Sequence, residues 1–139
     1  MIVNLQRKIK LDAKAFRPFA DELSTAAEET NGGEFSVAFV SDKRMTELNK
    51  LFRGKDLTTD VLSFPHGREE FEPDSGELGD IVISVEQAAK QAAENGLTLE
   101  NEIKQLILHG MLHLCGYDHE TDDGEMNARE LELRDKLGI

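Results

Sequence analysis

The sequence predicts an α+β fold in which a small mixed four-stranded sheet is covered by about five helices. Two patterns carry this prediction. Apolar residues alternate along 35–40, as in a strand, and they recur at helical spacing along 16–27. The expected order of elements is β-α-β-α-β-β-α-α-α. The 139 residues contain no repeat and no low-complexity linker, so we predict a single domain over 1–139.

The first third of the chain is expected to form two strands separated by one helix. Residues 2–5 are apolar enough for a strand. The helix that follows is expected to carry its apolar residues on one face, namely Phe16, Phe19, Ala20, Leu23, Ala26 and Ala27. Pro18 fits best near the start of this helix or at a kink, and Asn31-Gly32-Gly33 ends it. The alternation in 35–40 predicts the second strand.

The middle of the chain is expected to add a helix and two strands. Ser41 can cap the helix. The residues expected on its inner face are Met45, Leu48 and either Leu51 or Phe52. Residues 61–64 predict a short strand that Pro65 ends, and 78–83 predict another. Between them, the segment 66–77 is rich in Gly, Pro, Glu and Asp and is expected to be an exposed loop.

The last part of the chain is expected to form three helices. Ser84 and Gln87 match a capping box for the first of them. Thr98 can cap the second, which is expected to run to Gly116, and Thr121 can cap the third. The residues expected to point inward from the third helix are Met126, Leu133 and Leu137.

The charge of the chain limits its partners. The formal net charge is −12, which argues against non-specific nucleic-acid binding, because such binding needs clustered Lys and Arg. The stretch 42–68 nevertheless holds six Lys or Arg residues against four acids. An anion-binding face is therefore expected from the middle of the chain, and a solvated surface of mixed charge is the alternative.

The expected compartment is the cytoplasm. No apolar run approaches the roughly 20 residues that span a bilayer, so no membrane partner is expected. The N-terminus is not followed by the apolar region of a signal peptide. Cys115 is the only cysteine, so an internal disulfide is impossible, which agrees with a reducing compartment.

The residues that are most indicative of a chemical activity lie toward the C-terminus. The segment 106–116 is apolar nearly all round, so we expect a buried helix. Its His109 and His113 are four residues apart and share one face, where the two imidazoles can bind one metal ion. Gly116 can take a positive φ and reverse the chain. That reversal lets His119 return to the same ion.

Three histidines with this spacing predict a metzincin-like metal-binding helix and one catalytic zinc ion. The pattern His-x3-His-x2-Gly-x2-His matches the zinc ligands of metzincin proteases. Three protein ligands leave one coordination position open for water. The alternative for any one of these histidines is a hydrogen-bonded core residue. Cys115 points off the shared face, and we interpret it as part of the core.

One position departs from the protease pattern. Metzincins place a glutamate, the general base, directly after the first histidine, and here that position is Gly110. Peptide hydrolysis therefore lacks its proton acceptor. Asp118 can stand in for the base or orient a metal ligand. Asp122 and Asp123 are interpreted as acids of a solvated turn and of the first turn of a helix.

Three segments in order along the chain point to one family. They are His109-Gly110-Met111-Leu112-His113-Leu114-Cys115-Gly116-Tyr117-Asp118-His119, the stretch 48–65 with F-R-G-K-D and T-D-V-L-S-F-P, and L-G-D-I-V-I-S at 78–84. The first resembles the H-G-x-L-H-L-x-G-Y-D-H motif of the YbeY family of bacterial ribosomal RNA maturation endoribonucleases. Thr58 departs from the family, which often has proline there, and this bears on the rigidity of a turn.

The resemblance implies a zinc-dependent endoribonuclease for single-stranded RNA, acting in late 16S rRNA 3′-end maturation and 70S ribosome quality control. It implies one zinc ion on His109, His113 and His119, and catalytic roles for His109 and for Arg53 on the floor of a cleft leading to the metal. The implied partners are ribosomal RNA and ribosomal or ribosome-assembly proteins. Arginine beside zinc suits the charge that develops on a phosphoryl group. An ion pair with Asp56 is the alternative for Arg53.

Other readings of the same residues stay open at this point. The chain can be a metal-stabilised ribosome assembly factor without activity, whose acidic surface favours basic proteins. A metzincin-like peptidase is disfavoured by Gly110, and nothing marks a redox site. Ligand type does not separate zinc from nickel or cobalt. Whether water or the RNA 2′-OH attacks the phosphorus is also left open.

Overall fold

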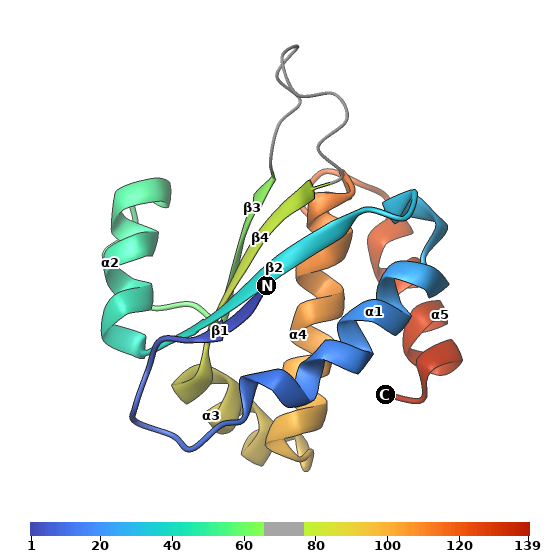
Figure 1. The fold of residues 1–139 in the computed structure, drawn as a ribbon. Coiled ribbons are helices and arrows are strands. Elements are labelled where there is room, and N and C mark those ends of the chain that lie inside the picture. The colour runs from blue at the N-terminus through green and yellow to red at the C-terminus, as the bar shows by residue number, and fades with distance from the viewer. Residues whose placement is uncertain (66–76) are drawn as a thin grey trace.

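The protein is represented by a computed structural model, which describes residues 1–65 and 77–139 (Figure 1). The strands are β1 (Ile2–Asn4), β2 (Glu34–Val40), β3 (Val61–Pro65) and β4 (Glu77–Ser84). The α-helices are α1 (Arg17–Ala26), α2 (Asp42–Arg53), α3 (Val85–Asn95), α4 (Leu99–Leu114) and α5 (Glu125–Leu137). Two short 3-10 helices, η1 (Ala13–Phe16) and η2 (Glu28–Thr30), flank α1. The predicted α+β class, with a mixed four-stranded sheet and five helices, is confirmed for the described residues.

The strands form one sheet in the order β1-β2-β4-β3. The strands β1, β2 and β4 are parallel, and β3 runs antiparallel to β4. In this register Val37 of β2 pairs with Ile81 of β4. Val61 at the start of β3 pairs with Ile83 near the end of β4. The two central strands, β2 and β4, therefore carry the residues on which the helices pack.

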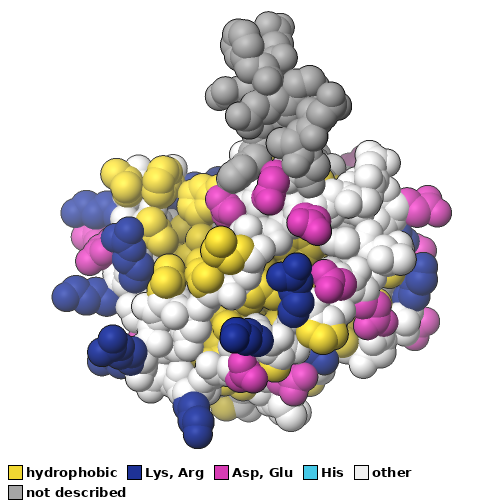
Figure 2. Space-filling model, in the orientation of Figure 1, with side chains coloured by type: hydrophobic (Ala, Val, Ile, Leu, Met, Phe, Trp, Pro, Cys, Tyr) yellow, Lys and Arg dark blue, Asp and Glu magenta, His cyan; other side chains and the backbone are white. Residues whose placement is uncertain are grey.

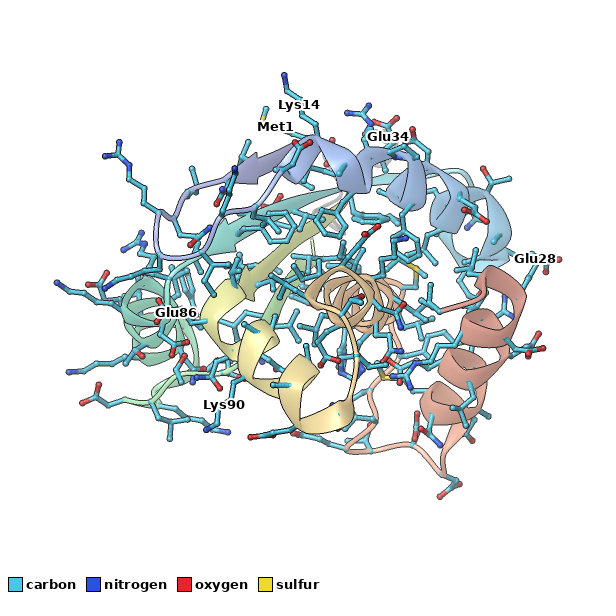
Figure 3. The ribbon with its side chains drawn as sticks, turned by 90° about the horizontal axis from the view of Figure 1, so that it is seen from below. Met1, Lys14, Glu28, Glu34, Glu86 and Lys90 are labelled. Atoms are coloured by element: carbon cyan, nitrogen blue, oxygen red, sulfur yellow. The ribbon has the colours of Figure 1, made fainter. Side chains whose placement is uncertain are left out.

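The main core lies between the sheet and α4. Figure 3 looks along the axis of α4, which has the other elements around it. The side chains of α4 that are completely buried are Ile103, Ile107, Leu108, Met111 and Leu112. Each such side chain contributes about 1.5–3 kcal/mol by leaving water. Burial on several sides is what the nearly unbroken apolar run of this helix predicted.

Among the described helices, α2 covers the opposite face of the sheet, where it contacts β4. A smaller core of Val40, Met45, Leu62 and Val82 lies there. Figure 2 shows apolar side chains gathered beside α2 and the strands on this side of the molecule. The prediction that Leu51 or Phe52 points inward is wrong, because these side chains are 75% and 57% exposed. Asn49 takes the inner position instead, where its amide donates to the carbonyl of Leu57 at 2.9 Å.

The predicted caps of α2, α3 and α4 form, although the capping box of α3 differs in its detail. The hydroxyls of Ser41 and Thr98 accept backbone N–H groups at the starts of α2 and α4, as predicted. Ser84 caps α3 by accepting from the backbone N–H of Gln87 at 3.3 Å. The capping box is not closed, since the Gln87 amide donates to Asp42 on α2 at 2.9 Å. A tertiary contact between α2 and α3 has replaced the local one.

The start of α5 differs from the prediction. Thr121 is not its cap, because the helix begins at Glu125. Asp122 serves the first turn instead, and its carboxylate accepts from the backbone N–H of Met126 at 3.0 Å. The predicted inward positions Met126 and Leu133 are buried. The choice of cap depended on where the preceding loop ends, which the spacing of apolar residues did not determine.

The bounds of β3 and β4 also differ slightly from the predicted ones. Pro18 lies in the first turn of α1, as expected. Pro65 is the last residue of β3 rather than the residue after it. Of the predicted loop, residues 66–76 lie outside the described residues, and Glu77 already belongs to β4. Within the described ranges, every helix is too short or too polar to span a bilayer.

Candidate metal centre and cleft

The C-terminal end of α4 brings the three predicted histidines together. His109 and His113 lie one turn apart on α4, which ends at Leu114. Gly116 has a φ of 100° and reverses the chain, as its position predicted. His119 then returns to the helix. One ring nitrogen from each histidine lies within 4.8 Å of the others, so the three can hold one metal ion.

The spacing of the nitrogens agrees with a tetrahedral metal site. Nδ1 of His119 lies 3.2 Å from Nε2 of His113. Two nitrogens that each bind a tetrahedral zinc ion at 2.0–2.1 Å are separated by roughly 3.3 Å. The donor set also fits, because imidazole nitrogens suit zinc and its neighbours in the first transition row. The assignment of these histidines as ligands stays a prediction.

Two hydrogen bonds fix the rings on α4. His109 Nδ1 lies 2.9 Å from Oε1 of Glu130 on α5. His113 Nδ1 lies 3.0 Å from the carbonyl oxygen of Tyr117. Both oxygens accept, so each Nδ1 carries the hydrogen and each Nε2 keeps its lone pair for an ion. The pairing of a carboxylate with a ligating histidine is frequent at metal sites and raises the basicity of the ligand.

The local electrostatics favour the metal-binding form of the histidines. Burial, and then the neighbouring His109 and His119, lower the pKa of His113, so its neutral imidazole is favoured. Burial alone raises the pKa of Glu130. The hydrogen bond from His109 and the positive charges of His109, Arg134 and His113 together outweigh that effect and hold the pKa of Glu130 below its usual value. The pair therefore combines a carboxylate with a ring that it orients.

Glu130 is the residue that the sequence analysis missed. Its side chain is 11% exposed, on the inner face of α5. It lies between Met126 and Leu133, two residues predicted to point inward. An acid at the buried spacing of an amphipathic helix was the available signal, since such an acid needs a partner. Asp118 lines the cleft, but its carboxylate accepts from the backbone N–H of Glu120 at 3.0 Å.

Gly110 has a packing role that explains the missing glutamate. A Cβ at this position would lie 2.8 Å from Cγ2 of Ile81. The helix α4 therefore rests directly on β4 at this point, and Ile81 is fully buried. The carbonyl of Gly110 also accepts from the hydroxyl of Ser63 on β3 at 3.2 Å. A side chain here would lift the histidine helix off the sheet.

A cleft of about 550 Å³ runs from the histidines toward the end of α2. The name histidine cleft is used for this hollow, whose lining includes Arg53, Lys55, Ser63, His109, His113 and His119. Arg53 reaches across it and donates from Nη2 to the carbonyl of Ser63 at 3.4 Å. Within the described residues Arg53 forms no ion pair, so the alternative pairing with Asp56 is not seen. Its positive charge faces the space beside the histidines.

A partly buried ion pair anchors the loop that carries His119. The guanidinium of Arg129 on α5 donates twice to Glu29 on η2, at 2.7 and 2.9 Å. The hydroxyl of Tyr117 donates to the same carboxylate at 2.9 Å. The bonds from Arg129 outweigh burial and lower the pKa of Glu29 to about 2. Because the Tyr117 carbonyl holds His113, this network connects η2 and α5 to the metal centre.

Cys115 belongs to the core, as interpreted from the sequence. It is partly buried against the main cluster, and its Sγ lies 3.5 Å from Sδ of Met111. Burial raises the pKa of its thiol to about 11. The thiolate that binds metals is therefore strongly disfavoured.

Comparison with known proteins identifies the family. Residues 1–138 match the family described as Endoribonuclease YbeY. The chain belongs to the YbeY family. Relatives named Endoribonuclease YbeY include one from Nautilia profundicola, 48% identical over 106 residues that cover 76% of this chain and 73% of the relative. One from Aquifex aeolicus is 51% identical over 114 residues, covering 80% of this chain and 73% of the relative.

A solved structure shares the fold. The solution structure of TM1509 from Thermotoga maritima aligns with a TM-score of 0.65 at 30% identity, covering 97% of this chain and 87% of that one. The resemblance seen in the sequence is thus confirmed as membership of the YbeY family. The matched range of this YbeY chain includes Arg53 and the three histidines, and also Glu130. The likeness of its histidine helix to that of metzincins stays a prediction.

Proposed function

We propose that the protein is a zinc-dependent endoribonuclease that cleaves single-stranded RNA. The observation that carries the proposal is one cleft in which three convergent histidines face Arg53 and Lys55. Membership of the YbeY family supports RNA as the substrate. The wider role follows the resemblance: late 16S rRNA 3′-end maturation and 70S ribosome quality control, in the cytoplasm, with ribosomal RNA and ribosomal or assembly proteins as partners.

The residues of the cleft suit phosphodiester hydrolysis. The transition state gathers negative charge on the phosphoryl oxygens, and a fixed guanidinium stabilises such charge. Arg53 is placed for this role by its bond to the carbonyl of Ser63. A zinc ion on the three histidines would supply Lewis acidity at the same phosphoryl group. Glu130 holds His109 in the orientation that this site needs.

The charge distribution favours a single strand. The two cations of the cleft belong to a chain with a net charge of −12. Only a short stretch of sugar-phosphate backbone therefore finds positive charge. A duplex would spread two rows of phosphates over the acidic surface, whereas one strand can enter the cleft with its bases exposed.

The decisive experiment compares cleavage of a single-stranded 16S rRNA 3′ fragment by wild type, His109→Ala and Arg53→Ala, with zinc measured on each sample. We expect both substitutions to lower the cleavage rate about a hundredfold or more. Only His109→Ala should lose zinc. Arg44→Ala is the matched control. Arg44 lies on the same helix but does not line the cleft, and it forms an ion pair of 3.0 Å with Glu47.

Three results would count against the proposal. Equal cleavage by all four proteins would mean that the activity comes from a contaminant. Cleavage that persists in zinc-free protein would remove the metal from the reaction. If no protein cuts RNA while His109→Ala lowers the melting temperature, a metal-stabilised assembly factor becomes the better description. A peptidase is disfavoured because Gly110 has no room for the general base.

A further inference from the structure

A second hollow of about 500 Å³ opens beside the histidine cleft. The name side hollow is used for it, and it is walled by residues of α3, α4 and α5. His109 and Asp60 line both spaces, so the two meet at the metal centre. Its volume lies within the range of about 300–1,000 Å³ that is usual for small-ligand sites. A group bound there would lie next to whatever is held at His109.

The polar groups of the side hollow differ from those of the histidine cleft. They comprise three carboxylates, three amides and one guanidinium: Asp60, Glu102, Glu130, Gln91, Asn95, Gln105 and Arg134. The carboxylates outnumber the single cation, so a phosphate would be repelled. The cleft, by contrast, presents Arg53 and Lys55. The two spaces are therefore suited to different parts of one nucleotide.

Several of these groups have hydrogen-bonding capacity to spare. Nε of Arg134 is buried and has no hydrogen-bond partner among the described residues. The partly exposed side-chain amide of Gln105 also has no hydrogen-bond partner among the described residues, and Gln105 lies one helical turn before His109 on α4. Glu102 is 5% exposed, and burial raises the pKa of its carboxyl group although Asn95 forms a hydrogen bond with it. A buried polar atom without a partner, such as Nε of Arg134, is rare in native proteins, and an occupant of the side hollow would supply that partner.

We propose that the side hollow binds one unstacked nucleobase that carries an exocyclic amino group, next to the phosphate held at the histidines. This inference rests on the proposed function. Proteins that read single-stranded RNA hydrogen-bond the edges of bases turned out of the stack. Carboxylates accept from exocyclic amines, and amides or arginine supply donors to ring nitrogens and carbonyls. The side hollow holds both kinds of group.

Uracil is the base that fits least well. It has no amino group, and its one N–H lies between two carbonyl oxygens. Both oxygens are acceptors, so neither can form a hydrogen bond with the three carboxylates of the side hollow. Cytosine, adenine and guanine each offer an amino group to Glu102 or Asp60 and an acceptor to Arg134 or Gln105. Discrimination against uracil at one fixed position beside the cleaved bond is the consequence.

The test is to sequence the cleavage products of a random single-stranded RNA pool. Zinc-loaded wild type is compared with Glu102→Gln and Gln105→Ala. We expect wild type to disfavour uracil about fivefold or more at one position next to the cut. Both variants should reduce this preference. It is measured as the ratio of products with different bases at that position, so it does not depend on the overall cleavage rate. Asn101→Ala is the matched control, since Asn101 is a half-buried amide of α4 that lines neither hollow.

The outcomes separate the two proposals. Cleavage without a base preference, or with a preference that both variants keep, overturns the base subsite and leaves the nuclease intact. If no RNA is cut, the nuclease proposal fails. The base subsite is then tested by binding of short oligocytidylate and oligouridylate, measured by fluorescence anisotropy. Tighter binding of oligocytidylate that Glu102→Gln abolishes would still support the subsite. Equal binding of the two would overturn it.

Discussion

At the scale of single residues, the candidate metal centre depends on groups other than the three histidines. Glu130 and the carbonyl of Tyr117 set which nitrogen of His109 and of His113 is free. Gly110 gives α4 its close approach to β4. Each of these residues acts through a neighbour, so replacing it should change a measurable property of the histidines or of their helix.

Replacing Glu130 with Gln should weaken zinc binding about tenfold, because the side chain keeps its shape but no longer offers a carboxylate to His109. Zinc affinity would be measured by competition with a fluorescent chelator. Asp135→Asn on the same helix is the control, since Asp135 is exposed. Equal affinities for Glu130→Gln and wild type would show that the hydrogen bond does not tune the ligand.

Gly110→Ala should destabilise the fold by about 1–3 kcal/mol, although alanine normally favours a helix. The new methyl group would lie 2.8 Å from Cγ2 of Ile81, which is completely buried and has little room to move. Urea unfolding would give the free energy. In an Ile81→Ala background the cost of Gly110→Ala should shrink. An unchanged cost there would contradict the packing explanation.

At the scale of elements, the site is assembled by contacts between segments distant in sequence. The ion pair of Glu29 with Arg129 joins η2 to α5, and Tyr117 joins both to the loop before His119. The contacts of Asp42 with Ser84 and Gln87 join α2 to α3. Figure 1 shows α5 packed beside α4, where the pair of His109 and Glu130 connects them.

Glu29→Gln should reduce stability in a pH-dependent way. The pKa of Glu29 falls from 4.5 to about 2 on folding, so its carboxylate stabilises the folded state above pH 4.5 and loses that effect as the pH falls toward about 2. The difference from wild type should be about 1–3 kcal/mol near neutral pH. It should disappear at the acid end of that window.

The measurement is urea unfolding across this pH range, in a chelator so that zinc binding does not contribute. Glu28→Gln is the matched control, because Glu28 is the exposed neighbour of Glu29 on η2. A difference between wild type and Glu29→Gln that stays constant from neutral pH to about 2 would show that the charge of Glu29 is not its source.

At the scale of the whole molecule, an acidic chain is proposed to bind an acidic polymer. The net charge of −12 repels RNA everywhere except where positive charge is local. Among the described residues, Arg53 and Lys55 are the cations that line the histidine cleft. Binding should therefore depend on few phosphate contacts and show a shallow dependence on salt, unlike that of a basic RNA-binding domain.

Lys55→Ala should reduce the salt dependence of RNA binding. For single strands, log K changes with log salt by about −0.7 per neutralised phosphate, so the slope should become shallower by about that amount. The binding of a labelled single-stranded RNA would be followed by anisotropy between about 50 and 200 mM salt, in a chelator to prevent cutting. Lys43→Ala, exposed at the other end of α2, should leave the slope unchanged.

The sequence alone predicted the order of the helices and strands and the three histidines that the structure brings together. Strand alternation, helical spacing and the caps at Ser41 and Thr98 are local patterns, and they predicted local structure correctly. The spacing of His109 and His113 on one helix face, with Gly116 to reverse the chain, was also sufficient to bring three imidazoles together. These features depend on interactions within a few residues.

Only the tertiary structure decided which distant groups serve the site. Glu130 contacts His109, which lies 21 residues earlier in the sequence. The side chain of Gln87 donates to Asp42 on α2 instead of closing the capping box at the start of its own helix. The inward turn of Asn49 and the close packing of Gly110 on Ile81 likewise depend on neighbouring elements. A buried polar group forms its hydrogen bond with whichever partner the packing brings close. The spacing of residues along the sequence does not show which partner that is.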